Sequence, residues 1–243
     1  MKMIVNGACG RMGAELIKRI DQSEDLELLC GVDIRADGSD SRVRADFPEE
    51  RPDVIIDFSH HSCTAPLLEY AVSHSVPTVL ATTGQTAEEN ALIREAAKKI
   101  PLFYSANMSL GVAAVSDFAR RAAALFPEAE IEIVETHHDQ KLDSPSGTAL
   151  MIANGIKEVR PQATLVCGRS GHGKRTKEEI GIHSLRLGNV VGEHQVILDT
   201  GDETIVITHK AHSRALFASG ALNAARFIAD KPAGLYDMRS MVE

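Results

Sequence analysis

Short strand-like segments alternate with helix-like segments over the first 105 residues, and this alternation limits the choice of fold. Runs rich in β-branched and apolar residues predict strands at residues 2–6, 26–32, 54–58, 78–81 and 102–105. The segments between them place apolar residues three and four apart, as amphipathic helices do. One such helix has a start signal, because Thr86 is followed by Glu89 at capping-box spacing. This alternation predicts βαβ units and a parallel sheet.

A different pattern begins near residue 108. A long apolar helix is predicted at residues 111–125, and alternating apolar residues predict a half-buried strand at 130–136. Further strand-like runs at 180–187, 193–198 and 203–209 favour a mixed or antiparallel sheet. A last helix is predicted at 213–229, before an irregular tail. The glycine-rich and basic segment 168–177 fits either a surface loop or a lid over a charged ligand.

Charge and cysteine content exclude several classes of function. The chain has 26 lysines and arginines against 34 aspartates and glutamates, a net charge of −8 that repels a nucleic-acid backbone. The four cysteines are widely separated and show no disulfide or zinc pattern, so we expect a cytoplasmic protein. No apolar run approaches the roughly 18 residues of a membrane span. An anionic ligand must therefore be bound by local amides and basic groups.

Glycines follow the first predicted strand, where the chain turns into a helix. The segment Gly7-Ala8-Cys9-Gly10-Arg11-Met12-Gly13 departs from the usual dinucleotide fingerprint, since glycine stands at position 7 instead of 8. Asp33 closes the second strand about 20 residues later, the offset at which a carboxylate reaches an adenosine ribose. A pyrophosphate would bind at the helix N-terminus. We therefore predict a Rossmann-type domain rather than a plain tight turn.

The choice of cofactor stays open between NADH and NADPH. The Asp33 carboxylate favours an unphosphorylated ribose because it repels a 2′-phosphate. Arg35, two residues later, is able to pair with such a phosphate or to lie solvated in a loop.

A second group of chemically active residues lies in residues 135–149. Two histidines and a lysine share one short loop, and a Ser-Gly-Thr segment follows at a predicted helix start: His137, His138, Lys141, Ser146, Gly147 and Thr148. Histidine exchanges protons near neutral pH, and lysine supplies a proton or a fixed positive charge. Hydroxyls and amides at a helix N-terminus suit a carboxylate. The alternatives are solvated histidines beside an ordinary N-cap, or metal ligands completed by Asp139 and Asp143. No histidine pair has helical metal-binding spacing, so we predict no metal.

These motifs, in this order, resemble the 4-hydroxy-tetrahydrodipicolinate reductases, also called dihydrodipicolinate reductases, which act in the diaminopimelate route to lysine. The most specific element of the resemblance is the loop at residues 137–148. Other matching segments cover nearly the whole chain: Asp57-Phe58-Ser59, Thr82-Thr83-Gly84, Ala106-Asn107-Met108-Ser109, Gly192-Glu193-His194 and Ile207-Thr208-His209-Lys210-Ala211. The resemblance implies NADH- or NADPH-dependent reduction of a cyclic dicarboxylate, with water lost overall. The alternatives are another small-molecule NAD(P)-dependent dehydrogenase, or a nucleotide-sensing protein without catalysis.

The resemblance also implies roles for individual residues. His137 is implied as the acid/base residue and Lys141 as the proton donor, while the substrate contacts are His138, Ser146, Gly147 and Thr148. The implied cofactor-binding residues are Gly7, Ala8, Cys9, Gly10, Arg11, Met12, Asp33, Ala81, Thr82, Thr83, Ala106, Asn107, Met108 and Ser109. The implied architecture is α/β: a Rossmann-type domain at residues 1–107 and 215–243, and a second α+β domain at 108–214. The second domain carries a mixed sheet and is implied to form a homotetramer.

Overall fold

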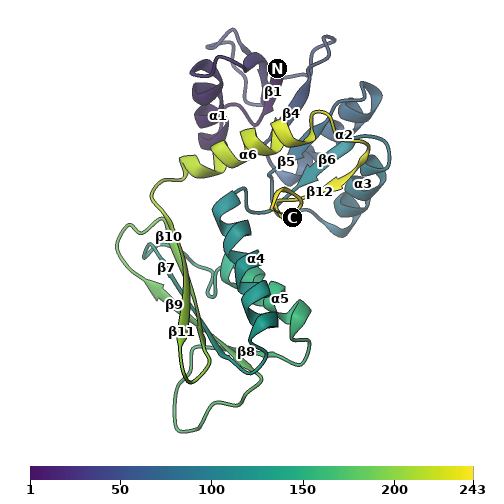
Figure 1. Ribbon diagram of the computed structural model, residues 1–243. Helices are drawn as coiled ribbons and strands as arrows, with labels where there is room; N and C mark the ends of the chain where they lie inside the picture. Colours follow the sequence, from purple (N-terminus) through teal and green to yellow (C-terminus); the bar gives the residue numbers. More distant parts are fainter. Residues whose placement is uncertain (243) are drawn as a thin grey trace. The chain divides into compact units, whose positions relative to one another are not determined.

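A seven-stranded sheet lies at the centre of the first of two units into which the chain divides in this computed structural model (Figure 1). The structure describes residues 1–242, with residues 1–109 and 215–241 in this first unit and residues 110–214 in the second. The strands are β1 (Lys2–Asn6), β2 (Glu27–Val32), β3 (Val43–Arg44), β4 (Val54–Asp57), β5 (Thr78–Leu80), β6 (Pro101–Tyr104) and β12 (Gly234–Tyr236). All are paired in parallel, in the order β12-β6-β5-β4-β1-β2-β3. The strand order reverses between β1 and β4, and ligands bind at such switch points.

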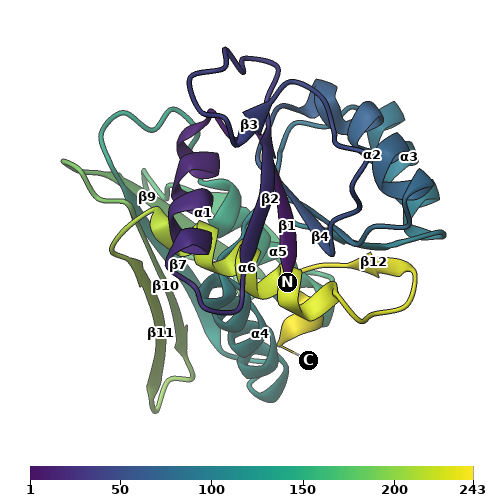
Figure 2. The ribbon, with the colours of Figure 1, turned by 90° about the horizontal axis from the view of Figure 1, so that it is seen from above.

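Helices cover both faces of this sheet (Figure 2). On one face lie α1 (Arg11–Asp21) and α6 (Ala215–Ile228); on the other lie the short 3-10 helix His61–Cys63, α2 (Thr64–Ser73) and α3 (Ala87–Ala97). The predicted capping box at the start of α3 is confirmed, since the side chains of Thr86 and Glu89 each accept a hydrogen bond from the other's backbone amide. Central strands covered on both faces bury their apolar side chains completely, as Ile4, Ile55 and Leu80 do.

The C-terminal tail differs from the prediction. The sequence predicts an irregular segment around Pro232 and Gly234, but residues 234–236 form β12, which pairs in parallel with β6, and a 3-10 helix follows at Arg239–Met241. The prediction of an irregular tail is therefore wrong. Three residues are too few to show a periodic pattern, and the strand owes its order to pairing with β6 and to the contact of Tyr236 with Phe227.

A five-stranded mixed sheet forms the second unit, and two helices pack on one of its faces (Figure 1). Its elements are α4 (Leu110–Leu125), β7 (Glu130–His137), α5 (Gly147–Val159), β8 (Thr164–Cys167), β9 (Glu179–Arg186), β10 (Gly192–Asp199) and β11 (Thr204–Ala211). In the strand order β11-β10-β7-β9-β8, β10 is antiparallel to both neighbours, whereas β7, β9 and β8 are parallel. The predicted fold class, a parallel Rossmann-type sheet with a second unit carrying a mixed sheet, is confirmed.

Residues along β7 alternate between the two faces of this sheet. Ile131 and Ile133 are fully buried in a core shared with α4 and α5, and Glu135 and His137 continue on the same face. The period of two thus brings a carboxylate and an imidazole to the helix-covered side of the sheet. Within residues 1–242 no helix combines the length and hydropathy that a membrane span requires.

Candidate active site

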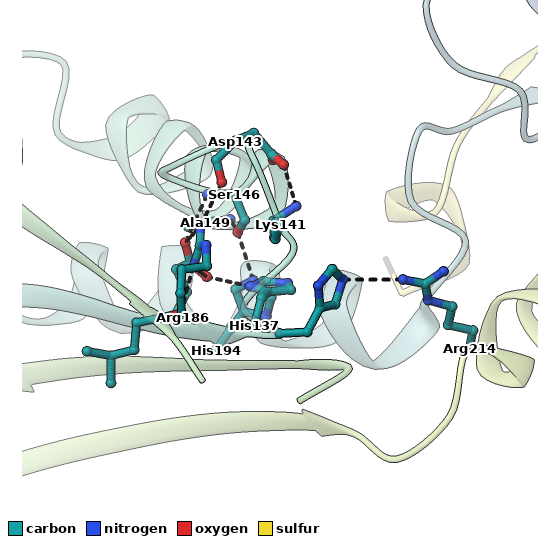
Figure 3. A network of polar contacts seen from close by, with 11 residues as sticks. His137, Lys141, Asp143, Ser146, Ala149, Arg186, His194 and Arg214 are labelled. Carbon is teal, nitrogen blue, oxygen red and sulfur yellow. Dashed lines mark hydrogen bonds and ion pairs between the residues drawn. The ribbon is translucent and has the colours of Figure 1, made fainter. Parts of the chain in front are cut away.

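His137 is the last residue of β7, and its imidazole is bound to a carboxylate from the same strand (Figure 3). Its Nδ1 hydrogen bonds to Oε2 of Glu135, and both side chains are buried, Glu135 completely. When Nδ1–H donates to a carboxylate, Nε2 is left as the nitrogen that takes up or releases a proton.

Glu135 accepts further hydrogen bonds from Arg186 and Ser146. Nη1 and Nη2 of Arg186 bind its two oxygens at 3.0 and 2.9 Å, and the amide of Ser146 binds Oε1 at 3.1 Å. Burial alone would raise the pKa of Glu135, but hydrogen bonds from Arg186, Ser184 and His137 outweigh it and lower the pKa to about 2. Glu135 is therefore a carboxylate at any pH near neutral.

The pKa of His137 is lowered, chiefly because burial disfavours the charged imidazolium. Glu135 acts in the opposite direction and raises this pKa, whereas the positive charges of Lys141 and Arg186 lower it further. The imidazole is consequently neutral at neutral pH. A ligand that carries negative charge to this position would favour the protonated form.

Ser146 begins α5 and joins it to a second buried histidine. Its Oγ accepts a hydrogen bond from the amide of Ala149, as an N-cap does, and lies 3.1 Å from Nε2 of His194 on β10. Burial, followed by the neighbouring His137, lowers the pKa of His194 to about 4. The His194 ring stands edge-on to that of His137 at 5.1 Å. The first turn of α5 carries no acidic residue, so its dipole favours an anion.

The segment between His137 and Ser146 holds the remaining predicted substrate residues. Lys141 Nζ donates a hydrogen bond of 2.8 Å to Asp143, and this contact lowers the pKa of the Asp143 carboxyl. His138 Nε2 lies 3.3 Å from a guanidinium nitrogen of Arg214 (Figure 3). Gly147 and Thr148 are the first two residues of α5. The structure thus gathers His137, Lys141 and the start of α5 in one region of the second unit.

The glycine turn of the first unit has the geometry of a pyrophosphate site. Gly7 has a φ of +83°, and a Cβ there would lie 2.6 Å from the carbonyl oxygen of Phe58. A Cβ on Gly13 would overlap the Gly7 carbonyl, which explains glycine at both positions. Gly10 is the N-cap of α1 and has no side chain to occupy the helix start, and no acidic residue lies in the first turn. The backbone here fits a dinucleotide pyrophosphate.

Asp33 and Arg35, which the sequence offers as rival ribose and phosphate contacts, form an ion pair with each other. Arg35 Nε and Nη2 each donate to the Asp33 carboxylate at 3.1 Å, and the Cys9 amide donates at 3.0 Å. Burial opposes ionisation of Asp33, but these hydrogen bonds outweigh it and lower its pKa. The Arg35 side chain is 64% exposed whereas that of Asp33 is 5% exposed, so the arginine is free to turn outward.

The other predicted cofactor residues follow the ends of β5 and β6. Because the strands of this sheet are parallel, these residues share its carboxyl edge with the glycine turn after β1. Met108 and Ser109 are buried, as are Ala81 and Thr82, whereas Thr83 and Ala106 are exposed and Asn107 is intermediate. The residues of the first unit therefore fit a pyridine dinucleotide.

Three residues of the site were not among those predicted: Glu135, Arg186 and His194. Strand alternation carries a signal for Glu135, since it lies two residues before His137 and shares its face. The sequence carries no local signal for Arg186 and His194. Strand pairing brings them to the site, because it sets Arg186 opposite His137 and His194 opposite Glu135. Gly192 adds a further constraint, since a Cβ there would lie 3.1 Å from His137 Nε2.

Both units match models of known protein families. Residues 1–108 match the model of the dihydrodipicolinate reductase N-terminus, and residues 111–242 match that of the C-terminus. The chain belongs to the dihydrodipicolinate reductase family. The resemblance predicted from the motifs is thereby confirmed, and as a member of this family the chain is an oxidoreductase that uses a pyridine nucleotide and a small-molecule substrate.

Relatives in this family match along their full length. The 4-hydroxy-tetrahydrodipicolinate reductase of Caldanaerobacter subterraneus subsp. tengcongensis is 42% identical, with 100% of this chain and 98% of the relative covered. That of Clostridium tetani is 41% identical, with coverage of 100% and 97%. The solved structure of a dipicolinate-bound dihydrodipicolinate reductase from Paenisporosarcina sp. TG-14 has a TM-score of 0.80 at 26% identity, covering 100% of this chain and 99% of that one.

Proposed function

We propose that the chain reduces 4-hydroxy-tetrahydrodipicolinate to tetrahydrodipicolinate, with NADH or NADPH, in the diaminopimelate route to lysine. The observation that carries this proposal is the buried His137, whose Nε2 is left for a proton beside the lysine and helix N-terminus that suit a dicarboxylate. The first unit binds the nucleotide and the second binds the substrate, which corresponds to functional domains at residues 1–107 with 215–243 and at 108–214.

The two carboxylates of the substrate need separate anchors. In this proposal Ser146, Gly147 and Thr148 bind one of them at the start of α5, through hydroxyls, amides and the helix dipole. His138, next to Arg214, binds the other. These anchors fix the ring in place. The amides and basic groups around it attract the dianion locally, although the net charge of the chain is −8.

The C4 hydroxyl of the substrate leaves as water together with a proton from the neighbouring ring carbon, which gives a conjugated imine. When bound, the nucleotide would supply a hydride to this imine, and the protein supplies one proton to the ring. His137 is neutral in the free protein, and the incoming dianion raises its pKa so that Nε2 takes up a proton. Lys141 is the alternative donor of this proton, and while protonated it adds a positive charge beside the ring. Together they stabilise the electron density that builds in the ring during hydride transfer.

We also propose that four chains assemble through the face of the mixed sheet opposite α4 and α5, in the cytoplasm. Leu185 and Val206 lie on that face and are 51% and 49% exposed, although strand residues of this type are usually covered. Light scattering after size-exclusion chromatography is expected to give four times the chain mass of 26.2 kDa.

The proposal is tested by following oxidation of NADH and NADPH in parallel. The substrate is generated by condensing pyruvate with aspartate semialdehyde. His137→Ala and Lys141→Ala should each lower kcat by about 10²- to 10⁴-fold, whereas Gln140→Ala, in the same loop, should not. Near wild-type kcat in both variants would refute the assignment. Turnover of other substrates alone would identify a different dehydrogenase, and nucleotide binding without turnover would identify a nucleotide sensor.

A further inference from the structure

We propose that Glu135 is a positioning residue that orients His137 and, at the same time, fixes the start of α5 relative to it. This inference rests on the proposed function in one respect: it takes His137 as the group that handles the proton. It goes beyond that function because one buried carboxylate, paired with Arg186, is given control of two positions: that of the His137 ring and that of the start of α5.

Both carboxylate oxygens of Glu135 accept hydrogen bonds. Oε2 accepts hydrogen bonds from Nδ1 of His137 and Nη1 of Arg186, and Oε1 accepts from Nη2 of Arg186 and the amide of Ser146. Arg186 thus binds both oxygens in the fork geometry that fixes a carboxylate most firmly. With two donors on each oxygen and no exposed surface, the carboxylate has one orientation.

Packing alone does not explain a carboxylate at this position. Ile131 and Ile133 occupy the preceding positions on the same face of β7, and the pattern calls for another apolar side chain at 135. Replacing a buried ion pair by apolar residues is often neutral or stabilising, so the pair is not needed for the core. Its donors point instead to a role in the site, since His137 and Ser146 are residues proposed to act on the substrate.

The first role concerns His137. A carboxylate that accepts from Nδ1 fixes the neutral ring in the tautomer with hydrogen on Nδ1 and holds the lone pair on Nε2. Nε2 lies beside Gly192 on β10, where a Cβ would approach it to 3.1 Å. Without Glu135 the ring loses both its tautomer preference and its only hydrogen bond to an anion in the described chain.

The second role concerns α5. The Ser146 amide is bound to Oε1 of Glu135, while Ser146 Oγ caps the helix. A substrate carboxylate held at the start of α5 is therefore at a fixed position relative to His137, because one side chain ties both. Loss of Glu135 should accordingly raise KM as well as lower kcat.

The test compares Glu135→Gln with Arg186→Gln in the full-length protein. The charges facing His137 are Glu135 on its own strand, Lys141 in the loop, Arg186 from β9 and His194 from β10. Glu135 favours the protonated imidazole and Arg186 opposes it. Glu135→Gln should therefore shift the His137 titration to lower pH, and Arg186→Gln should shift it to higher pH. Both should lower kcat by at least tenfold.

Two measurements follow these shifts. The pH profile of kcat/KM reports the titration during catalysis, and ¹⁵N–¹H NMR of the imidazole nitrogens, assigned with His137→Gln, reports the pKa and tautomer without substrate. If the wild-type protein does not turn over the substrate, the proposed function fails, yet the NMR data still decide whether Glu135 orients His137. If it turns over but the tautomer is unchanged in Glu135→Gln, the positioning role alone fails.

The chain offers a matched control on the other face of β7. Glu132 also binds an arginine and a histidine, Arg175 at 3.0 Å and His183 at 2.9 Å. Glu132→Gln should leave the His137 titration unchanged. Glu135→Asp guards against failure to fold, since it keeps the charge while shortening the reach, and should give kcat between those of wild type and Glu135→Gln. The proposal would be overturned if Glu135→Gln and Glu135→Asp lost Tm and kcat equally, and if Glu135→Gln and Arg186→Gln did not shift the His137 titration in opposite directions.

Discussion

Gly192 lies beside the nitrogen that we propose to carry the proton. A methyl group at this position would approach His137 Nε2 to 3.1 Å, closer than ordinary van der Waals contact allows. The constraint is steric and local, because Gly192 has no positive φ and alanine is compatible with its backbone.

Gly192→Ala should therefore impair catalysis more than stability. We expect kcat/KM to fall about tenfold or more, since a small displacement of a catalytic group is costly to the rate, and Tm to change little. Gly173→Ala is the control, because a Cβ at that position meets nothing within 4 Å. Steady-state assays and thermal melts of the two variants distinguish the effects; full activity in Gly192→Ala would mean that Nε2 is not the reacting nitrogen.

Asp33 and Arg35 predict how the protein uses NADH and NADPH. The carboxylate is buried and held by Arg35 and the Cys9 amide, and the exposed guanidinium can leave it for a 2′-phosphate. We expect both nucleotides to be oxidised, with Asp33→Ala raising KM for NADH about tenfold and Arg35→Ala raising KM for NADPH by a similar factor. Initial rates with each nucleotide measure this. Equal changes for both nucleotides in both variants would contradict it.

Helix starts are the elements that the sequence specifies most directly. At α3 the capping box of Thr86 and Glu89 is a local signal, because both partners lie within four residues and need no tertiary contact. At α5 the N-cap serine is also local, but its hydroxyl and amide are bound by His194 and Glu135 from other strands. An N-cap thus only stabilises a helix in the first unit, whereas in the second unit the N-cap residue also contacts side chains of the proposed active site.

Thr86→Ala should lower the free energy of unfolding by about 1 kcal/mol without changing kcat. Thr86→Ser retains the accepting oxygen and should lose much less. Urea unfolding followed by far-ultraviolet circular dichroism measures both variants. An alanine variant as stable as the wild type would show that the cap contributes nothing to α3.

Three edge strands, β3, β12 and β8, are elements that the sequence failed to predict, whereas the longer edge strand β11 was predicted. β3 has two residues and β12 three, and β8 has four residues, none of which is buried. Each is too short or too exposed to alternate clearly, and each exists because a longer neighbour pairs with it. The central strands, whose buried faces impose a pattern, were predicted to within a few residues.

The response of the whole molecule to acid follows from its buried histidines. The pKa of His194 is about 4 in the folded protein and about 6.5 in the unfolded chain, which therefore binds more protons below pH 6.5. This contribution to stability is present above about pH 6.5 and is lost as the pH falls toward 4. Glu135, with a pKa of about 2, loses its contribution only below about pH 4.5.

We therefore expect the free energy of unfolding to fall by an amount on the order of 3 kcal/mol between pH 6.5 and 4 through His194 alone. His194→Gln should flatten this dependence, and His172→Gln, at an exposed loop position, should not. Urea unfolding at several pH values measures the slope. The same slope in His194→Gln and wild type would show that His194 is not buried as a neutral group.

Local signals were enough to predict the central strands, the helix starts, the glycine turn and the density of histidine and lysine at residues 137–141. Those signals were sufficient for the fold class and the family. Tertiary structure alone decided which residues meet. The register of β9 and β10 against β7 sets Arg186 opposite His137 and His194 opposite Glu135, from segments about 50 residues away in the chain. The physical reason is that strand register depends on which faces of the whole sheet are buried together and on the connections between strands, so one segment alone does not fix it.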